Sequence, residues 1–199
     1  MYRNFNRFFY LFLIIMSISG CASTLVGGAA SIGLASVQER SIKDAAIDLK
    51  LEVQIQEKLF RTNSGKLFAN VGVTILEQRV MLVGNVESQK LRDLASEIAW
   101  GISPKIKDVL NELTIGENTS LVSEAKDARI SLSLSGLLIG DAEISDINFS
   151  HSVSKQIIFL IGIAQDTNEL DKVIYHARTV KGVKKVISHL ILKNDKKRM

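Results

Sequence analysis

The chain contains one cysteine, Cys21, and one proline, Pro104, and its longest uninterrupted apolar run covers only Phe8–Met16. A single cysteine excludes a disulfide framework inside the chain. A membrane-spanning helix needs about 20 consecutive apolar residues, so the run at Phe8–Met16 is too short to be one. Both features lie in the amino-terminal segment, where the cysteine follows the apolar run.

Signatures of the common enzyme classes are absent as well. The chain has no Gly-x-Ser-x-Gly elbow and no phosphate loop that ends in Lys-Ser or Lys-Thr. Its histidines, His151, His176 and His189, share no metal-ligand spacing with one another or with nearby carboxylates. We therefore expect no catalytic residues, no metal site and a non-enzymatic role. A hydrolase with a carboxylate pair assembled by the fold is kept as an alternative.

The first residues are typical of an export signal. Arg3 and Arg7 precede the apolar run, and small residues follow it as far as Cys21. Ile18-Ser19-Gly20-Cys21 resembles the lipobox of bacterial lipoproteins. The resemblance implies cleavage between Gly20 and Cys21, a lipid on the Cys21 sulfur and a further acyl chain on the new amino terminus. The alternative is an ordinary signal peptide followed by a chance cysteine.

Location and cofactors follow from the same resemblance. Ala22 stands where an Asp would favour retention in the inner membrane of enterobacteria. We therefore expect a lipid-anchored protein on the periplasmic face of the outer membrane. No cofactor is expected besides the covalent acyl chains on Cys21, because nothing in the chain has the pattern of a cofactor site.

Positive charge is concentrated in the second half of the chain. Residues 22–119 contain 11 basic and 12 acidic side chains, whereas residues 120–199 contain 12 and 9. A mildly basic half near a bilayer favours contact with anionic headgroups. The alternative is a solvated surface plus a basic tail. The net charge of +4 is too modest to indicate a nucleic-acid partner.

The remaining sequence repeats one pattern twice. An apolar run ending near a glycine occurs at Val80–Val86 and again at Ile157–Ile163. Each run is followed by a helical apolar stripe and then by a closing strand, at residues 106–113 and 183–190. A weaker strand precedes each run, marked by alternating apolar residues; these are Ala69, Val71, Val73 and Ile75 in the first half and Ile147 and Phe149 in the second.

The segment that opens each half has two conflicting periodicities. Leu49, Leu51 and Val53 alternate as in a strand, while Leu51, Ile55 and Leu59 recur every four residues as in a helix. Length favours helices over residues 44–60 and 121–138, because both segments exceed a typical strand.

The sequence thus predicts an α+β fold with two small domains. Each has the order helix-strand-strand-helix-strand and a three-stranded mixed sheet with helices on one face. Leu82 and Phe159 should lie in the core. Gly84 and Gly162 should mark a close backbone approach or a bend at a strand end. The expected segments are a signal peptide (1–20), a lipidated flexible tether (21–42), two domains (43–116 and 117–193) and a basic tail (194–199).

This pattern resembles the BON domains. The shared features are the apolar strands ending in Gly and the closing Gly182-Val183-Lys184-Lys185-Val186. A lipobox followed by two such domains is similar to the DolP-type lipoproteins. The resemblance implies a non-enzymatic envelope protein that supports outer-membrane integrity and binds anionic phospholipid through its second domain. The alternative is a scaffold or assembly factor that binds an envelope protein.

The resemblance also implies where lipid is bound. The family's contact surface is the first helix of the second domain, which places Lys126 and Arg129 as cations and Ile130 as an inserting side chain. The family has a tryptophan at the position that matches Arg129, so the interfacial aromatic is missing here. The alternative for Lys126 and Arg129 is a solvated helix face.

Overall fold

The computed structural model describes residues 41–62, 69–116 and 120–198, which form two domains of the same element order. Domain 1 contains α3 (Ile42–Arg61), β1 (Val71–Leu76), β2 (Arg79–Val86), α4 (Gln89–Ile102) and β3 (Asp108–Ile115). Domain 2 contains α5 (Leu121–Gly140), β4 (Phe149–Ser154), β5 (Ile157–Ala164), α6 (Thr167–Thr179) and β6 (Lys185–Leu192). Two short 3₁₀ helices, η2 (Asp146–Asn148) and η3 (Lys196–Arg198), complete the described residues of domain 2.

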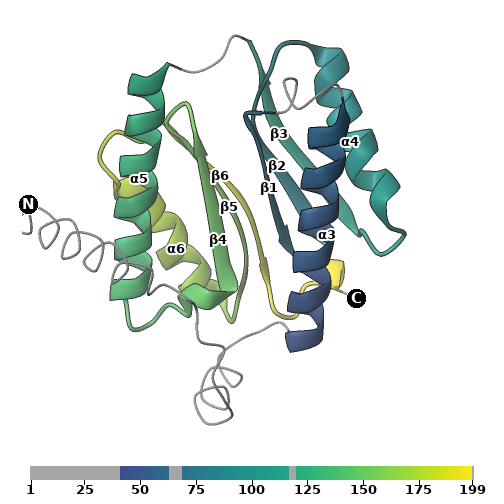
Figure 1. Cartoon of the computed structure of the whole chain (residues 1–199). Helices are drawn as coiled ribbons and strands as arrows, with labels where there is room; N and C mark the ends of the chain where they lie inside the picture. Colours follow the sequence, from purple (N-terminus) through teal and green to yellow (C-terminus); the bar gives the residue numbers. More distant parts are fainter. Residues whose placement is uncertain (1–40, 63–68, 117–119, 199) are drawn as a thin grey trace, which may run out of the picture. The chain divides into compact units, whose positions relative to one another are not determined.

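Each domain has one three-stranded sheet with its second strand in the middle. β2 pairs antiparallel with β1 and parallel with β3, and β5 pairs in the same way with β4 and β6. A parallel pair needs a crossover connection, and α4 and α6 supply it (Figure 1). The predicted fold class and the mixed sheets are confirmed.

Strand limits differ slightly from the prediction. β3 and β6 begin at Asp108 and Lys185, two residues later than expected. Ile147, expected in a strand, lies in η2, because the backbone N–H of Asn148 donates to the Ser145 carbonyl at 2.9 Å and closes a tight turn. β4 therefore begins at Phe149.

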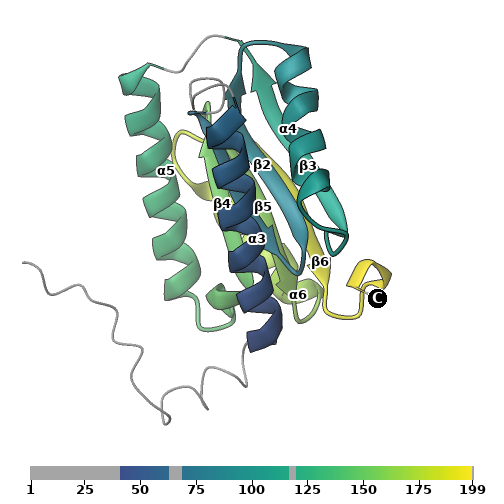
Figure 2. The same cartoon turned by 45° about the vertical axis from the view of Figure 1, so that its right-hand side comes forward.

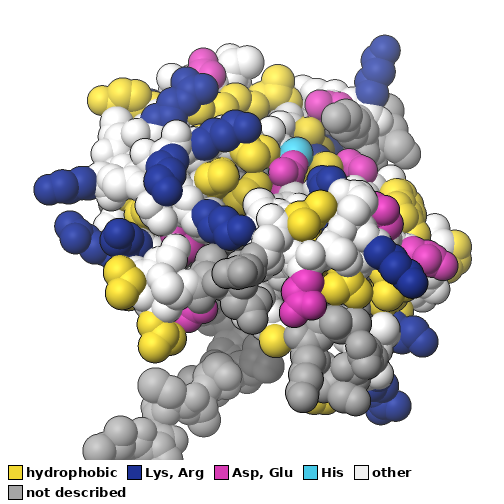
Figure 3. Space-filling view, turned by 90° about the horizontal axis from the view of Figure 1, so that it is seen from above, with side chains coloured by type: hydrophobic (Ala, Val, Ile, Leu, Met, Phe, Trp, Pro, Cys, Tyr) yellow, Lys and Arg dark blue, Asp and Glu magenta, His cyan; other side chains and the backbone are white. Residues whose placement is uncertain are grey.

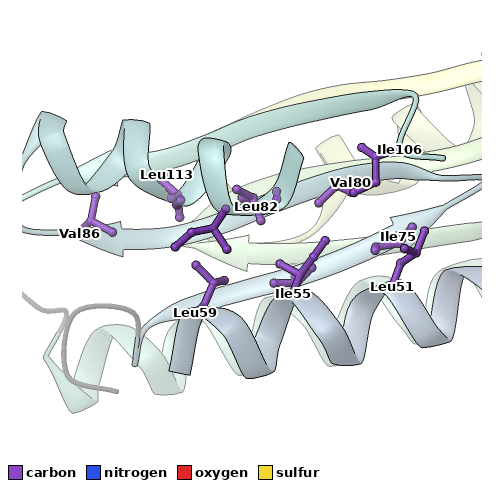
Figure 4. Packing of buried hydrophobic residues seen from close by; sticks show 13 residues of the cluster. Leu51, Ile55, Leu59, Ile75, Val80, Leu82, Val86, Ile106 and Leu113 are labelled. Carbon is purple, nitrogen blue, oxygen red and sulfur yellow. The ribbon is translucent and has the colours of Figure 1, made fainter. Parts of the chain in front are cut away.

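The ambiguous opening segments are helices. Ser41 and Ser120 begin α3 and α5 as N-caps, each accepting a hydrogen bond from a backbone N–H of the first turn. In α3 the buried face contains Leu51, Ile55 and Leu59, which point toward the sheet in Figure 4. The alternating residues Leu49 and Val53 are exposed, so their period-two pattern does not mark a strand.

The middle strands are buried on both faces. One face of each packs on the helices of its own domain, through Val80, Leu82 and Val86 in β2 and Ile158, Leu160 and Ala164 in β5. The other faces meet in a layer between the two sheets, formed by Leu76, Met81, Val83, Phe159, Ile161, Ile163 and Ile191. Leu82 and Phe159 are both buried as predicted, but only Leu82 lies under its own helices. Figure 2 shows the two sheets between the helices.

Polar contacts join the domains at the margin of this layer. The Arg198 guanidinium donates to both carboxylate oxygens of Glu77, from Nε at 2.8 Å and from Nη2 at 2.6 Å. His189 Nε2 lies 2.8 Å from Glu112 Oε1. The basic tail is therefore tied to domain 1 through Arg198, because two parallel bonds to one carboxylate fix the guanidinium.

Candidate functional site

Helix α5, the predicted lipid-contact helix, is fixed to its sheet by a buried aspartate. The Asp127 carboxylate accepts backbone N–H bonds from Lys155 at 2.8 Å and Gln156 at 2.7 Å. These residues form the β4–β5 turn and have φ of 53° and 64°, values that L-residues rarely adopt. Charge-assisted bonds of this kind compensate the turn's backbone strain and set the position of α5 along the sheet.

Domain 1 contains the same device, and sequence reasoning missed both copies. Asp48 on α3 accepts the backbone N–H groups of Glu77 at 2.7 Å and Gln78 at 2.9 Å. The sequence feature that could have revealed these contacts is an aspartate on the buried apolar face of each helix. Asp48 lies three residues before Leu51, and Asp127 lies three residues before Ile130. A charged residue at a buried position needs hydrogen-bond partners, so each aspartate indicated polar groups beneath its helix but not that they belong to a turn.

The outer surface of α5 combines cations with apolar side chains. Lys126 and Arg129 are exposed near its beginning. Residues 130–140 contain no charged side chain. Several large apolar side chains face solvent along the helix, with exposed fractions of 83 % for Leu121, 65 % for Val122, 75 % for Leu132 and 69 % for Ile139. Exposed apolar groups beside cations are typical of a surface that meets a bilayer.

Ile130 does not belong to this surface, so its expected insertion into lipid is wrong for this fold. It is only 2 % exposed and packs in the core of domain 2 with Leu134 and Leu138. It lies three residues after Asp127 and four before Leu134, the spacing of one helix face. Lys126 and Arg129, by contrast, are both solvent-accessible.

Both predicted structural glycines lie where another chain segment passes closely. At Gly84, which has φ of +141°, an added Cβ would lie 1.8 Å from the Asn70 carbonyl oxygen. At Gly162 it would lie 2.4 Å from Phe149 Cδ1 and 2.9 Å from the Asn148 carbonyl oxygen. Each glycine lies two residues before the end of its strand and opposite the start of the edge strand.

Each histidine contacts a protein group. His176 Nε2 lies 2.8 Å from Asp141 Oδ2, and this hydrogen bond lowers the pKa of Asp141. Burial lowers the pKa of His151, whose Nε2 lies 3.0 Å from Ser131 Oγ and 3.2 Å from the Ser131 carbonyl oxygen. Both contacts of the His151 ring are thus made to one residue of α5.

The described part of the chain contains neither a metal cluster nor a membrane-spanning helix. Within residues 41–62, 69–116 and 120–198, no group of three or more His, Cys, Asp or Glu side chains is placed to hold a metal ion. In the same ranges, no helix is both long enough and apolar enough to cross a membrane. The predicted lipidation site Cys21 and the predicted cleavage site between Gly20 and Cys21 lie outside the described residues, as do the segments predicted to be a signal peptide (1–20) and nearly all of a tether (21–42).

The chain matches one known domain family twice and resembles several known proteins along most of its length. The BON domain family matches residues 47–117 and 126–194. An uncharacterized protein in the gshII 5′ region of Anaplasma centrale is 36 % identical over 158 residues, which cover 79 % of this chain and 99 % of that protein. The outer membrane lipoprotein DolP of Haemophilus influenzae is 23 % identical over 170 residues, covering 85 % of this chain and 87 % of DolP.

A third relative is a 21 kDa hemolysin of Actinobacillus pleuropneumoniae. It is 24 % identical over 151 residues, which cover 76 % of this chain and 77 % of the hemolysin. The two family matches coincide with the two domains of the structure, each with its own sheet. The chain therefore belongs to the BON domain family and is a dual-BON protein of the DolP type.

Proposed function

We propose that this protein is an exported, non-enzymatic envelope lipoprotein acylated at Cys21. Domain 2 binds anionic phospholipid through α5 and so supports outer-membrane integrity, with the protein on the periplasmic face of the outer membrane. Homology to DolP, an outer membrane lipoprotein, supports this location. Two or three acyl chains on one residue make attachment lasting, because each buried CH₂ contributes about 0.8 kcal/mol.

The outer surface of α5 is the observation that carries the lipid proposal. Lys126 and Arg129 are exposed cations, and each contributes about 1 kcal/mol beside anionic headgroups. Leu121 and Val122, in the first turn of α5, offer exposed apolar area that burial in a bilayer would remove from water. This chain has Arg129 where the family has an interfacial tryptophan. Charge should therefore contribute a larger part of the binding free energy here than in those relatives.

Vesicle binding tests this proposal. The mature chain with Cys21→Ser, which carries no acyl group, is sedimented with phosphatidylcholine vesicles that contain or lack phosphatidylglycerol. We expect preference for the anionic vesicles. Lys126→Ala with Arg129→Ala should weaken that binding about thirtyfold, the factor for about 2 kcal/mol. Binding should also fall as salt rises.

A matched control removes two cations from domain 1. Lys43 and Lys50 are exposed on α3, the helix that corresponds to α5. Lys43→Ala with Lys50→Ala changes the net charge equally and should leave vesicle binding within about twofold of the parent. Equal loss in both double variants, or no preference of the parent chain for anionic vesicles, would refute lipid binding through α5.

A scaffold role is the second candidate, and α3 favours it. Ile42, Leu49, Val53 and Phe60 are 55–70 % exposed and recur at the spacing of one helix face. Exposed apolar stripes on a helix are used to dock a partner helix. Crosslinking in cells from a photoreactive group at Val53 should recover one envelope protein in stoichiometric amount if this role holds. Recovery of lipid alone would contradict it.

A further inference from the structure

Domain 2 is more positively charged than domain 1 at a set of seven structurally equivalent positions. The equivalence is fixed by Asp48 and Asp127, by the two tight turns, by the helix N-caps Ser88 and Asp166, and by the strand register. In domain 2 all seven positions are cationic: Lys126, Arg129, Lys155, Arg178, Lys181, Lys184 and Lys185. In domain 1 they are Ile47, Lys50, Glu77, Trp100, Ser103, Lys107 and Asp108, which have no net charge.

The fold does not require five of these cations, because domain 1 adopts the same fold with a neutral or acidic residue at those positions and keeps a cation only at Lys50 and Lys107. Two positions reverse sign between the domains, since Glu77 corresponds to Lys155 and Asp108 to Lys185. A charge difference of this size at one end of one domain indicates an anionic partner there. We call this set of seven positions the basic end of domain 2.

Contacts bring the three elements of the basic end together. Asp127 on α5 holds the β4–β5 turn, and the Lys184 backbone N–H donates to the Gln156 carbonyl in that turn at 2.8 Å. Gly182 of the α6–β6 loop lies beside α5, since an added Cβ would be 3.8 Å from Ile130 Cδ1. Figure 3 looks onto this end and shows Lys and Arg side chains gathered over domain 2.

Most of this charge is available to a ligand. Six of the cations are exposed, and the seventh, Lys155, donates from Nζ to Asn85 Oδ1 at 2.8 Å. Both carboxylate oxygens of Asp127 are occupied by backbone N–H groups, which leaves Glu124 as the exposed acid on this part of α5. The acids of the loops at the opposite end of domain 2 are Asp141, Glu143, Asp146 and Asp166.

The first turn of α5 adds apolar groups at the same end. Leu121 and Val122 are 83 % and 65 % exposed and precede Lys126 by one turn. Ile139, at the other end of α5, lies about 25 Å away along the helix axis. Cations around an exposed apolar pair form a surface that binds headgroups and inserts shallowly into a bilayer.

We infer that domain 2 meets the anionic bilayer end-on, with the α6–β6 loop sharing the headgroup contacts and the first turn of α5 inserting. This rests on the proposed lipid function and specifies its site. Helix α5 then enters the interface with its N-terminal end and does not lie flat on the membrane.

Loop variants test the shared headgroup contacts. Lys181→Ala with Lys184→Ala, in the chain with Cys21→Ser, should weaken binding to phosphatidylglycerol vesicles about thirtyfold, as much as removal of two cations from α5. The Lys43→Ala with Lys50→Ala variant is again the control. Unchanged binding of the loop variant would overturn the inference while leaving the proposed function intact. Loss of lipid preference in the parent chain would remove the proposed function itself.

Labelled variants test the end-on geometry. With Cys21→Ser the chain has no other cysteine, so Val122→Cys and Ile139→Cys each accept one environment-sensitive dye. Anionic vesicles should shift the emission of the dye at position 122 toward shorter wavelength and leave the dye at 139 unchanged. Equal shifts at both positions would show a helix lying flat and would overturn the inference.

Discussion

Gly84→Ala should destabilise the protein by about 3 kcal/mol or more. The new Cβ would lie 1.8 Å from the Asn70 carbonyl oxygen, and φ of +141° is a conformation that side-chain-bearing residues rarely adopt. Backbone atoms would have to move, because the nearest atoms belong to β1 and the residue before it and not to a flexible side chain. The free energy of unfolding in urea measures the effect.

Gly136→Ala provides the matched control for this substitution. Gly136 lies inside α5, and nothing is within 4 Å of a Cβ placed there. Alanine in a helix interior should stabilise the protein by about 0.5–1 kcal/mol. If Gly84→Ala unfolded at the same urea concentration as the parent, the close approach of β2 to Asn70 would be wrong.

Phe159→Ala should cost about 3–5 kcal/mol and weaken the coupling between the domains. Phe159 is 1 % exposed and fills the layer between the two sheets, where Met81 and Val83 of β2 also lie. In the parent chain this shared layer should make both domains unfold together. Without the phenyl ring, each domain should unfold in a separate transition.

The single tryptophan makes this separation measurable. Trp100 belongs to α4, so its fluorescence reports on domain 1, whereas far-ultraviolet circular dichroism reports on both domains. The two signals should coincide in the parent and in Leu160→Ala, whose side chain packs only in the core of domain 2. They should diverge in Phe159→Ala. Coincident transitions in all three chains would show that the inter-sheet layer does not couple the domains.

Much of the fold was predictable because both halves repeat the same local signals. Glycine-terminated strands, helix stripes and segment lengths gave the element order and the mixed sheets. The packing of one sheet on the other was not predicted, although the apolar runs around Leu82 and Phe159 are continuous. A continuous run is typical of a strand buried on both faces. It does not tell whether a helix or another sheet covers the second face.

The candidate site was predicted less well, and Ile130 shows why. Residues 130–140 of α5 are apolar or small on every side, so the sequence does not reveal which face is buried. Asp127 determines which face of α5 is buried. Its carboxylate must lie over the β4–β5 turn to accept hydrogen bonds from the backbone N–H groups of that turn. That contact is made by residues far apart in the chain, and periodicity within one helix does not report it.

The mass of the native protein, extracted from membranes, tests most directly whether the chain is an exported lipoprotein. We expect a polypeptide that begins at Cys21 and carries a diacylglyceryl group, with or without an amide-linked acyl chain. Replacement of Cys21 by Ser should abolish the added mass and release the protein from the membrane. A native chain that begins at Met1 with a free thiol would contradict both the anchor and the location built on it.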